Sequence, residues 1–163
     1  MSLTVEEKKA RRRAREITRK HIDRVREIMS VFTGVLDAAA FNHDKSKFDE
    51  IELGPLAKMQ QIIDRDGQAE YGSDEYKKRT KILGPMLKHH YANNPHHPEH
   101  HKDGMDGMDL FYVVEMFADW KAASERGEQA HMSLSKACEK YEVSDQLKSI
   151  FENTAKRMGW AYE

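Results

Sequence analysis

Residues 41–48, FNHDKSKF, bring an imidazole, a carboxylate and two ammonium groups into one short stretch of chain. His43 and Asp44 are adjacent, so they cannot lie on the same face of a regular helix. At a helix end, however, the backbone leaves its regular path, and both side chains can converge on one metal ion. They offer such an ion a neutral nitrogen and an anionic oxygen. The stretch therefore predicts a metal site, provided that other parts of the chain supply further ligands.

A cluster of histidines is the second source of candidate ligands. The chain contains nine histidines, and six of them are His89, His90, His96, His97, His100 and His101. Residues 91–107 contain two prolines and two glycines without an apolar period, which predicts a loop. The first two histidines precede this loop, on the last turn of a helix. The helix end and the loop therefore carry most of the candidate histidine ligands.

A third candidate is Asp119, in the most apolar helix of the chain, residues 108–124. A carboxylate between Phe117 and Trp120 is costly to bury unless a cation or strong donors meet it. Glu115 lies four residues earlier and shares a neighbouring face. The apolar stripe expected to face the core is Leu110, Val113, Val114, Phe117 and Trp120. The alternative for Asp119 is a salt bridge to an arginine.

His21 is the fourth candidate, and it lies in a long N-terminal helix. Ile17, Val25, Ile28 and Phe32 recur with it at three and four residues, which predicts that His21 points inward. The alternative is a core histidine that bonds a backbone carbonyl. The preceding basic run, residues 8–15, is interpreted as a solvated helix end, with nucleic-acid binding as the alternative.

Helix signals recur along the whole chain, and no stretch alternates as a strand does. The 163 residues therefore predict an all-α fold, a single-domain helical bundle over residues 1–163. Thr4 begins a capping box, and further candidate N-caps are Ser73, either Asp106 or Asp109, and Ser144. Breaks between or within helices are expected at Thr33-Gly34, Gly54-Pro55, Gly84-Pro85 and Gly127.

The composition limits the classes of partner expected for the protein and the cellular compartment in which it is expected. The net charge of −1 disfavours a nucleic-acid or membrane binder that uses its whole surface, although the basic run leaves nucleic acid open. Cys138 is the only cysteine, so no internal disulfide forms and a cytoplasmic setting is favoured. No apolar run has the length of a membrane span or the pattern of a signal peptide. Motifs typical of redox dithiols, dinucleotide binding, P-loops and hydrolase elbows do not occur.

The four candidates together form a nitrogen and oxygen donor set suited to Mn, Fe, Co, Ni, Zn or, less well, Mg. His21, His43-Asp44 and Asp119 resemble the H…HD…D signature of the HD-domain metal-dependent phosphohydrolases, an all-helical superfamily. The chain is still more similar to a small, largely uncharacterised family of phage and bacterial proteins. The similar segments are HIDRV (21–25), HDKSKF (43–48), HHYANNPHH (89–97) and EMFADWKAAS (115–124), within residues 17–126. Residues 127–163 are expected only to add packing helices.

This resemblance implies roles for individual residues. It implies a first metal bound by His21, His43, Asp44 and Asp119, and a second bound by His90 and His97. HDKSK is similar to the HDxxK of two-metal phosphodiesterases, which implies that Lys47, aided by Lys45, contacts a substrate phosphate. His89 and His96 are expected near the substrate, and Asp44, Lys47 and Glu115 are the expected catalytic residues. The chain lacks the glycine-tyrosine-proline loop of those enzymes.

The sequence and the resemblance together favour a phosphohydrolase that uses one or two divalent metal ions and a metal-activated water. The expected substrate is a nucleotide or another small phosphate ester. One alternative is a non-catalytic metal- or nucleotide-binding module of the same fold, and another is a di-iron redox enzyme. A helical domain with a surface histidine tract is the remaining alternative. The apolar face of the last helix either closes the core or forms a homodimer.

Overall fold

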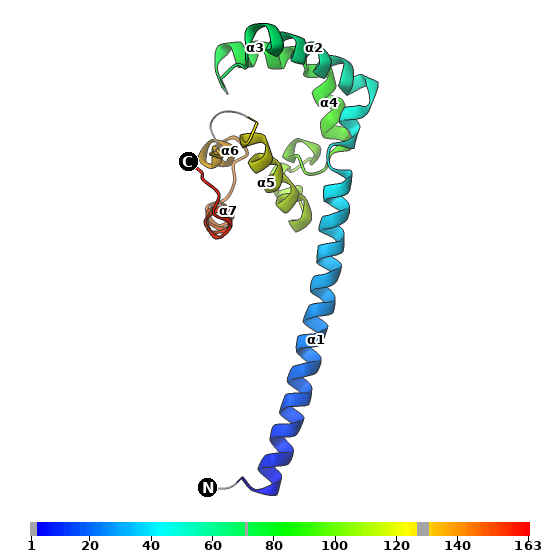
Figure 1. The fold of residues 1–163 in the computed structure, drawn as a ribbon, viewed down its shortest axis with the longest axis vertical. Helices are drawn as coiled ribbons and strands as arrows, with labels where there is room; N and C mark the ends of the chain where they lie inside the picture. Colours follow the sequence, from blue (N-terminus) through cyan, green and yellow to red (C-terminus); the bar gives the residue numbers. More distant parts are fainter. Residues whose placement is uncertain (1–2, 71, 127–130) are drawn as a thin grey trace. The chain divides into compact units, whose positions relative to one another are not determined.

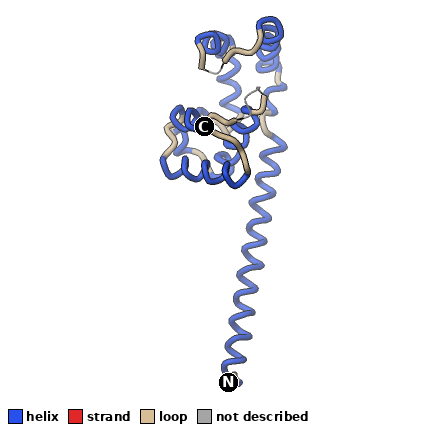
Figure 2. The backbone as a smooth tube through the Cα atoms, turned by 60° about the vertical axis from the view of Figure 1, so that its left-hand side comes forward, coloured by secondary structure: helices blue, strands red, loops and turns tan. Residues whose placement is uncertain are grey.

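The computed structural model describes residues 3–70, 72–126 and 131–163, and within these ranges helices joined by loops make up the regular structure (Figures 1 and 2). The predicted all-α class is confirmed, since the only strand-like feature in the described ranges is an isolated bridge between Met132 and Tyr162. Among the described helices, none is both long enough and apolar enough to cross a membrane.

Backbone contacts divide the chain into two units, Met1–Phe41 and Asn42–Glu163. The first unit consists mainly of helix α1 (Val5–Asn42). The predicted capping box is present at its start, because Thr4 N donates to Glu7 Oε2 (2.7 Å) and Glu7 N to Thr4 Oγ1 (3.2 Å). The predicted break at Thr33-Gly34 is wrong, since α1 runs through both residues. One glycine costs a helix only about 1 kcal/mol relative to alanine, which a long helix tolerates.

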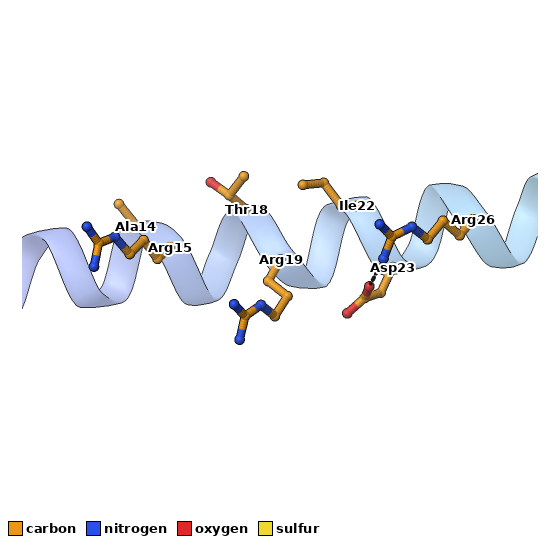
Figure 3. A pocket seen from close by; sticks show the side chains of 7 residues that line it. All are labelled: Ala14, Arg15, Thr18, Arg19, Ile22, Asp23 and Arg26. Atoms are coloured by element: carbon orange, nitrogen blue, oxygen red, sulfur yellow. Dashed lines mark hydrogen bonds and ion pairs between the residues drawn. The ribbon is translucent and has the colours of Figure 1, made fainter.

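The side chains of α1 are exposed, and none of them is buried. Exposed fractions along the predicted apolar stripe are 69% for Ile17, 45% for Val25 and 42% for Ile28. The described residues of the first unit by itself contain no second helix to pack against this stripe, so the predicted burial of the stripe stays a prediction. The basic run is exposed as interpreted. Farther along the same helix, Figure 3 shows Arg19 pointing away from the helix and Arg26 turned along it toward Asp23, to which Arg26 is bonded at 3.0 Å.

The second unit begins with the one-turn helix η1 (Lys45–Phe48), followed by α2 (Glu50–Asp66), α3 (Asp74–Ile82) and α4 (Gly84–Asn93) (Figure 1). The predicted break at Gly54-Pro55 is wrong, because α2 continues through it and loses only the donor that proline lacks. Two further expectations for this part of the chain are confirmed. Ser73 caps α3 by accepting from Tyr76 N at 3.1 Å, and α4 restarts at Gly84 with Pro85 in its first turn.

The histidine-rich segment is irregular apart from two one-turn helices, η2 (Pro98–His100) and η3 (Gly104–Gly107). The chain continues into α5 (Leu110–Ser124), α6 (Leu134–Lys140) and α7 (Asp145–Met158). Asp109 caps α5, as predicted, by accepting from Phe111 N and Tyr112 N at 2.9 Å. Gly127, the predicted stop of this helix, lies outside the described residues.

The hydrophobic core of the second unit lies among α5, α6 and α7. Its buried members are Met116, Phe117, Met132, Leu134, Cys138, Phe151 and Ala155. The rings of Phe117 and Phe151 stack with centroids 4.7 Å apart. Part of the predicted α5 stripe is wrong, since Leu110 is 61% exposed and Val114 42% exposed. Neither takes part in this core, whereas Val113 and Trp120 pack against it.

Candidate metal centre

The backbone turns sharply at Asp44, between α1 and η1. Asp44 adopts a left-handed conformation (φ 54°, ψ 21°), which aspartate tolerates better than most residues. This turn directs two adjacent side chains to one place, with His43 Nε2 3.4 Å from Asp44 Oδ2. The two side chains therefore lie close together at a helix end, and their binding of one shared ion stays a prediction.

One group of candidate ligands consists of Asp44, His90, His96 and His97, whose ligand atoms all lie within 4.8 Å of one another. Asp44 Oδ1 lies 3.4 Å from His90 Nε2 and 3.6 Å from His96 Nε2. The Nε2 atoms of His90 and His97 are 2.9 Å apart. Ligands at the corners of a tetrahedron with bonds of about 2.1 Å are themselves about 3.4 Å apart. The spacing of these atoms therefore suits a single ion.

Two atoms of this group, Asp44 Oδ1 and His96 Nε2, are buried without a hydrogen-bond partner among the described residues. Because His96 Nδ1 contacts the Glu115 carboxylate at 3.1 Å, the ring proton belongs on Nδ1 and the lone pair on Nε2. Both orphaned atoms are therefore acceptors, and they face each other across 3.6 Å. Each unpaired buried acceptor costs about 1–3 kcal/mol. A bound cation removes both penalties, so the donor set fits a metal.

Glu115 fixes two of the imidazoles. Its Oε1 accepts from Nδ1 of His43 at 2.9 Å and from Nδ1 of His96 at 3.1 Å. Burial opposes its negative charge, but the hydrogen bonds from His43 and His96 outweigh burial and lower the pKa of Glu115 to about 2. Glu115 is thus an ionised acceptor that aims both Nε2 atoms at the centre, and its expected catalytic role stays a prediction.

Glu52 likewise accepts hydrogen bonds from two further histidines, His89 and His90. It was not among the site residues predicted from the sequence. The residue is fully buried, with Oε1 accepting from His89 Nδ1 at 2.7 Å and Oε2 from His90 Nδ1 at 2.9 Å. One signal was available in the sequence. Glu52 precedes Leu56 by four residues and therefore continues the apolar stripe of α2, where a carboxylate needs partners.

A second group consists of His43, His96 and Asp119, and it adjoins the first because both contain His96. His43 Nε2 lies 3.6 Å from Asp119 Oδ1. Hydrogen bonds to Asp119 and Glu115 raise the pKa of His43 to about 10 although burial opposes them, so the metal-free ring is cationic. The same negative surroundings favour a divalent cation in place of that proton.

Two imidazoles of the centre, His90 and His97, are neutral, which is the form that binds metals. Burial lowers the pKa of His90. Burial, reinforced by the neighbouring His96 and His90, lowers the pKa of His97 to about 3. These two rings therefore keep a lone pair available near neutral pH.

Lys45 and Lys47, the two lysines predicted to bind phosphate, lie close to His43 and Asp44. Lys47 Nζ forms an ion pair with Asp44 Oδ2, and its side chain is 30% exposed. Burial opposes ionisation of Asp44, but this ammonium helps to keep the pKa of Asp44 below its usual value. Lys45 Nζ donates to Asn42 Oδ1 at 2.7 Å. Lys47 is thus both next to a candidate ligand and accessible from solvent.

The remaining predicted site residues lie in different surroundings. His21 is exposed on α1, in the other unit, and its role as a ligand stays a prediction. His89, expected near the substrate, contacts Glu52 as described above. His96, also expected at the substrate, is only 2% exposed and belongs to both ligand groups. Its expected role at the substrate stays a prediction.

Comparison with known proteins identifies a family, but the function of that family is not known. The sequence model of DUF5662, a family of unknown function, matches residues 10–157. No curated protein and no solved structure matches the chain. Both groups of candidate ligands lie within the matched residues.

Proposed function

The chain belongs to the DUF5662 family, and since that family has no known function, we propose from the site itself that the protein is a metal-dependent phosphohydrolase. One observation carries the proposal: Asp44 Oδ1 and His96 Nε2 are buried acceptors that face each other without hydrogen bonds in the described part of the chain. Three imidazoles and one carboxylate are typical of sites for Mn, Fe, Co, Ni or Zn. The proposed substrate is a nucleotide or another small phosphate ester.

Each side chain has a distinct part in this proposal. Asp44, His90, His96 and His97 hold the ion, with His43 and Asp119 beside them. A divalent ion supplies a nucleophilic water at neutral pH and polarises a phosphoryl oxygen. Lys47 neutralises negative charge that develops on the phosphoryl oxygens. Its proximity to Asp44 and its partial exposure support this role over that of a purely structural ion pair.

Metal content per chain is the first test. Plasma mass spectrometry of the tag-free protein should find at least one tightly held transition-metal ion, and the Asp44→Ala variant should lose it. Asp49→Ala is the matched control, because Asp49 is an exposed carboxylate outside both ligand groups. Equal metal in the wild type and Asp44→Ala would mean that the metal binds elsewhere, and the proposal would fail.

Hydrolysis is the second test. With the metal identified in the first test, the wild type should hydrolyse 4-nitrophenyl phosphate or bis(4-nitrophenyl) phosphate, and Asp44→Ala should be inactive. Lys47→Ala should retain metal yet lose about 10²-fold in kcat/KM, as expected when one charge-stabilising donor is removed. Full activity in Asp44→Ala would refute the mechanism.

A non-catalytic metal site is the second candidate, and the burial of the ligands favours it. Side-chain exposure is 2% for His96 and 4% for His90, and structural metal sites are similarly closed. His43 and Asp119, at 29% and 18%, leave the neighbouring group more open, as a catalytic site requires. Bound metal without hydrolysis of either ester would favour this candidate. A coloured protein with near-ultraviolet charge-transfer bands would indicate a di-iron redox centre instead.

A further inference from the structure

A cavity of about 420 Å³ lies among α2, α3 and α4 in the second unit. Its apolar walls are Met59 and Ile63 from α2, together with Leu83 and Leu87 at and after the start of α4. Pockets that hold small organic ligands have volumes of roughly 300–1,000 Å³. The cavity is therefore large enough for one or two fused rings with a small substituent.

The polar and aromatic side chains of the cavity suit a flat ring. Tyr76 and Tyr91 line it, and aromatic side chains stack on planar rings with a gain of about 1–3 kcal/mol per ring. Gln68 also lines it, and its amide presents a donor and an acceptor to the polar edge of a heterocycle. Arg79 is anchored to Gly67 O (2.7 Å) and Glu75 (2.8 Å), which braces this side of the cavity.

Tyr91 connects the cavity with the candidate metal centre. Its ring lies 5.1 Å from the ring of His97 and 6.0 Å from the ring of His90, both measured between centroids. These two histidines belong to the first ligand group. One side chain thus lines the cavity and also contacts the residues expected to hold the metal.

We propose that this cavity binds the aromatic ring of a phosphate ester whose phosphate lies at the metal centre. The inference rests on the proposed function, and it narrows the substrate to esters with a planar organic group. Either a nucleobase or a simple aryl group supplies such a ring. The phosphate binds through the metal and Lys47, whereas the ring binds through Tyr76, Tyr91 and Gln68.

Binding of the ring alone tests the cavity without any need for catalysis. Adenosine and 4-nitrophenol, which lack phosphate, are titrated calorimetrically into the full-length metal-loaded protein. At least one of them should bind with a Kd below about 1 mM, as expected for a small ligand with good stacking. Binding of adenosine alone indicates a nucleobase pocket, and binding of 4-nitrophenol indicates an aryl pocket; both results support the proposal.

Ala69→Phe fills the cavity, since Ala69 lines it, and should weaken ring binding at least about tenfold. Ala57→Phe is the matched control, because Ala57 is exposed on α2 outside the cavity lining, and it should bind the ring as the wild type does. Gln68→Ala replaces an exposed side chain and therefore keeps the test valid if Ala69→Phe fails to fold; about fivefold weaker binding is expected.

The cavity proposal and the phosphohydrolase proposal would fail in different experiments. Asp44→Ala should leave ring binding unchanged while it abolishes binding of ribose 5-phosphate, which carries a phosphate but no aromatic ring. If neither adenosine nor 4-nitrophenol binds the wild type, or if Ala69→Phe and Gln68→Ala bind them normally, the cavity proposal is overturned even when metal-dependent hydrolysis stands. If the ring binds but Asp44→Ala keeps its metal, the phosphohydrolase proposal fails and the ring site remains.

Discussion

The histidines of the candidate metal centre are oriented by two glutamates that are not themselves members of either ligand group. Glu115 accepts from His43 and His96, and Glu52 accepts from His89 and His90. In each case the ionised glutamate accepts a hydrogen bond from Nδ1, so Nε2 faces away from the carboxylate. In His43 a metal ion would have to replace the proton that Nε2 carries in the metal-free ring. This is the arrangement by which outer carboxylates fix both the tautomer and the direction of metal-binding imidazoles.

Replacing Glu115 should weaken the metal site without emptying it. In Glu115→Gln the charge is lost and the amide group donates as well as accepts, so His43 and His96 are held less firmly. We expect metal affinity to fall roughly 10–100-fold, measured by competition with a chromophoric chelator. Glu125→Gln is the control, because Glu125 is exposed and pairs only with Lys121 among the described ion pairs. An unchanged affinity in Glu115→Gln would show that Glu115 does not orient the ligands.

Cys138 should react slowly with thiol reagents in the folded protein. Its side chain is buried in the core, and this burial raises the pKa of the thiol. A raised pKa leaves less thiolate at pH 8 than in the unfolded chain, and thiolate is the reactive form. We expect labelling by a disulfide reagent to be at least about tenfold slower in buffer than in denaturant. Equal rates in the two conditions would contradict the burial of this residue.

At the scale of the elements, the histidine-rich segment is held in place by histidines that lie outside both ligand groups. His100 Nδ1 donates to Tyr91 O at 2.7 Å, and His101 Nε2 donates to Pro95 O at 2.8 Å. These bonds add to the backbone hydrogen bonds between residues three apart in this segment, such as the bond from His100 N to His97 O (3.0 Å). The loop that carries His96 and His97 is therefore shaped by two imidazoles that need no metal.

Gly107 shows how closely this segment is packed. A Cβ atom at this position would lie 2.8 Å from His101 Cβ, so Gly107→Ala must displace His101 and strain its bond to Pro95. We expect a loss of about 1–3 kcal/mol in the free energy of unfolding by urea. Gly54→Ala is the control, since Gly54 is helical with no atom within 4 Å of the added carbon, and it should be neutral or stabilising. A neutral Gly107→Ala variant would mean that the segment adjusts freely.

At the scale of the whole molecule, the hydrophobic core of the second unit and most of its candidate metal ligands lie on different elements. The core is built by α5, α6 and α7, whereas most candidate ligands lie in the turn before η1, on α4 and in the histidine-rich segment. Helix α5 takes part in both, because Met116 and Phe117 enter the core while Glu115 and Asp119 face the metal centre. Stability of the core and occupancy of the site should therefore be separable by mutation.

Truncation of Phe151 tests that separation. Phe151 is 3% exposed and stacks on Phe117, so Phe151→Ala should reduce the free energy of unfolding by about 3–5 kcal/mol. Ile150→Ala is the control, because Ile150 is 51% exposed and should cost far less. Urea unfolding gives both values, and metal content per folded chain should stay that of the wild type. A small loss in Phe151→Ala would place the core elsewhere.

The sequence by itself determined the helical class, several of the helix ends and most of the residues that are candidates for the site. The caps at Thr4, Ser73 and Asp109 were predictable because capping depends on residues three apart at most. The breaks at Gly34 and Gly54-Pro55 were not, because helix continuity depends on the summed propensity of many residues. Periodicity likewise identified apolar stripes without showing which of them are buried.

Only the tertiary structure decided which candidates meet. Within the second unit it brought Asp44, in the turn after α1, to His90, His96 and His97. His21 lies in the other unit, and its role as a ligand stays a prediction. The structure also revealed Glu52, a residue far from the histidines in sequence but within hydrogen-bond distance of two of them. The physical reason is that a ligand set is a property of distances between side chains. Residue types set what each group can donate or accept, whereas packing of the helices sets which groups share one ion.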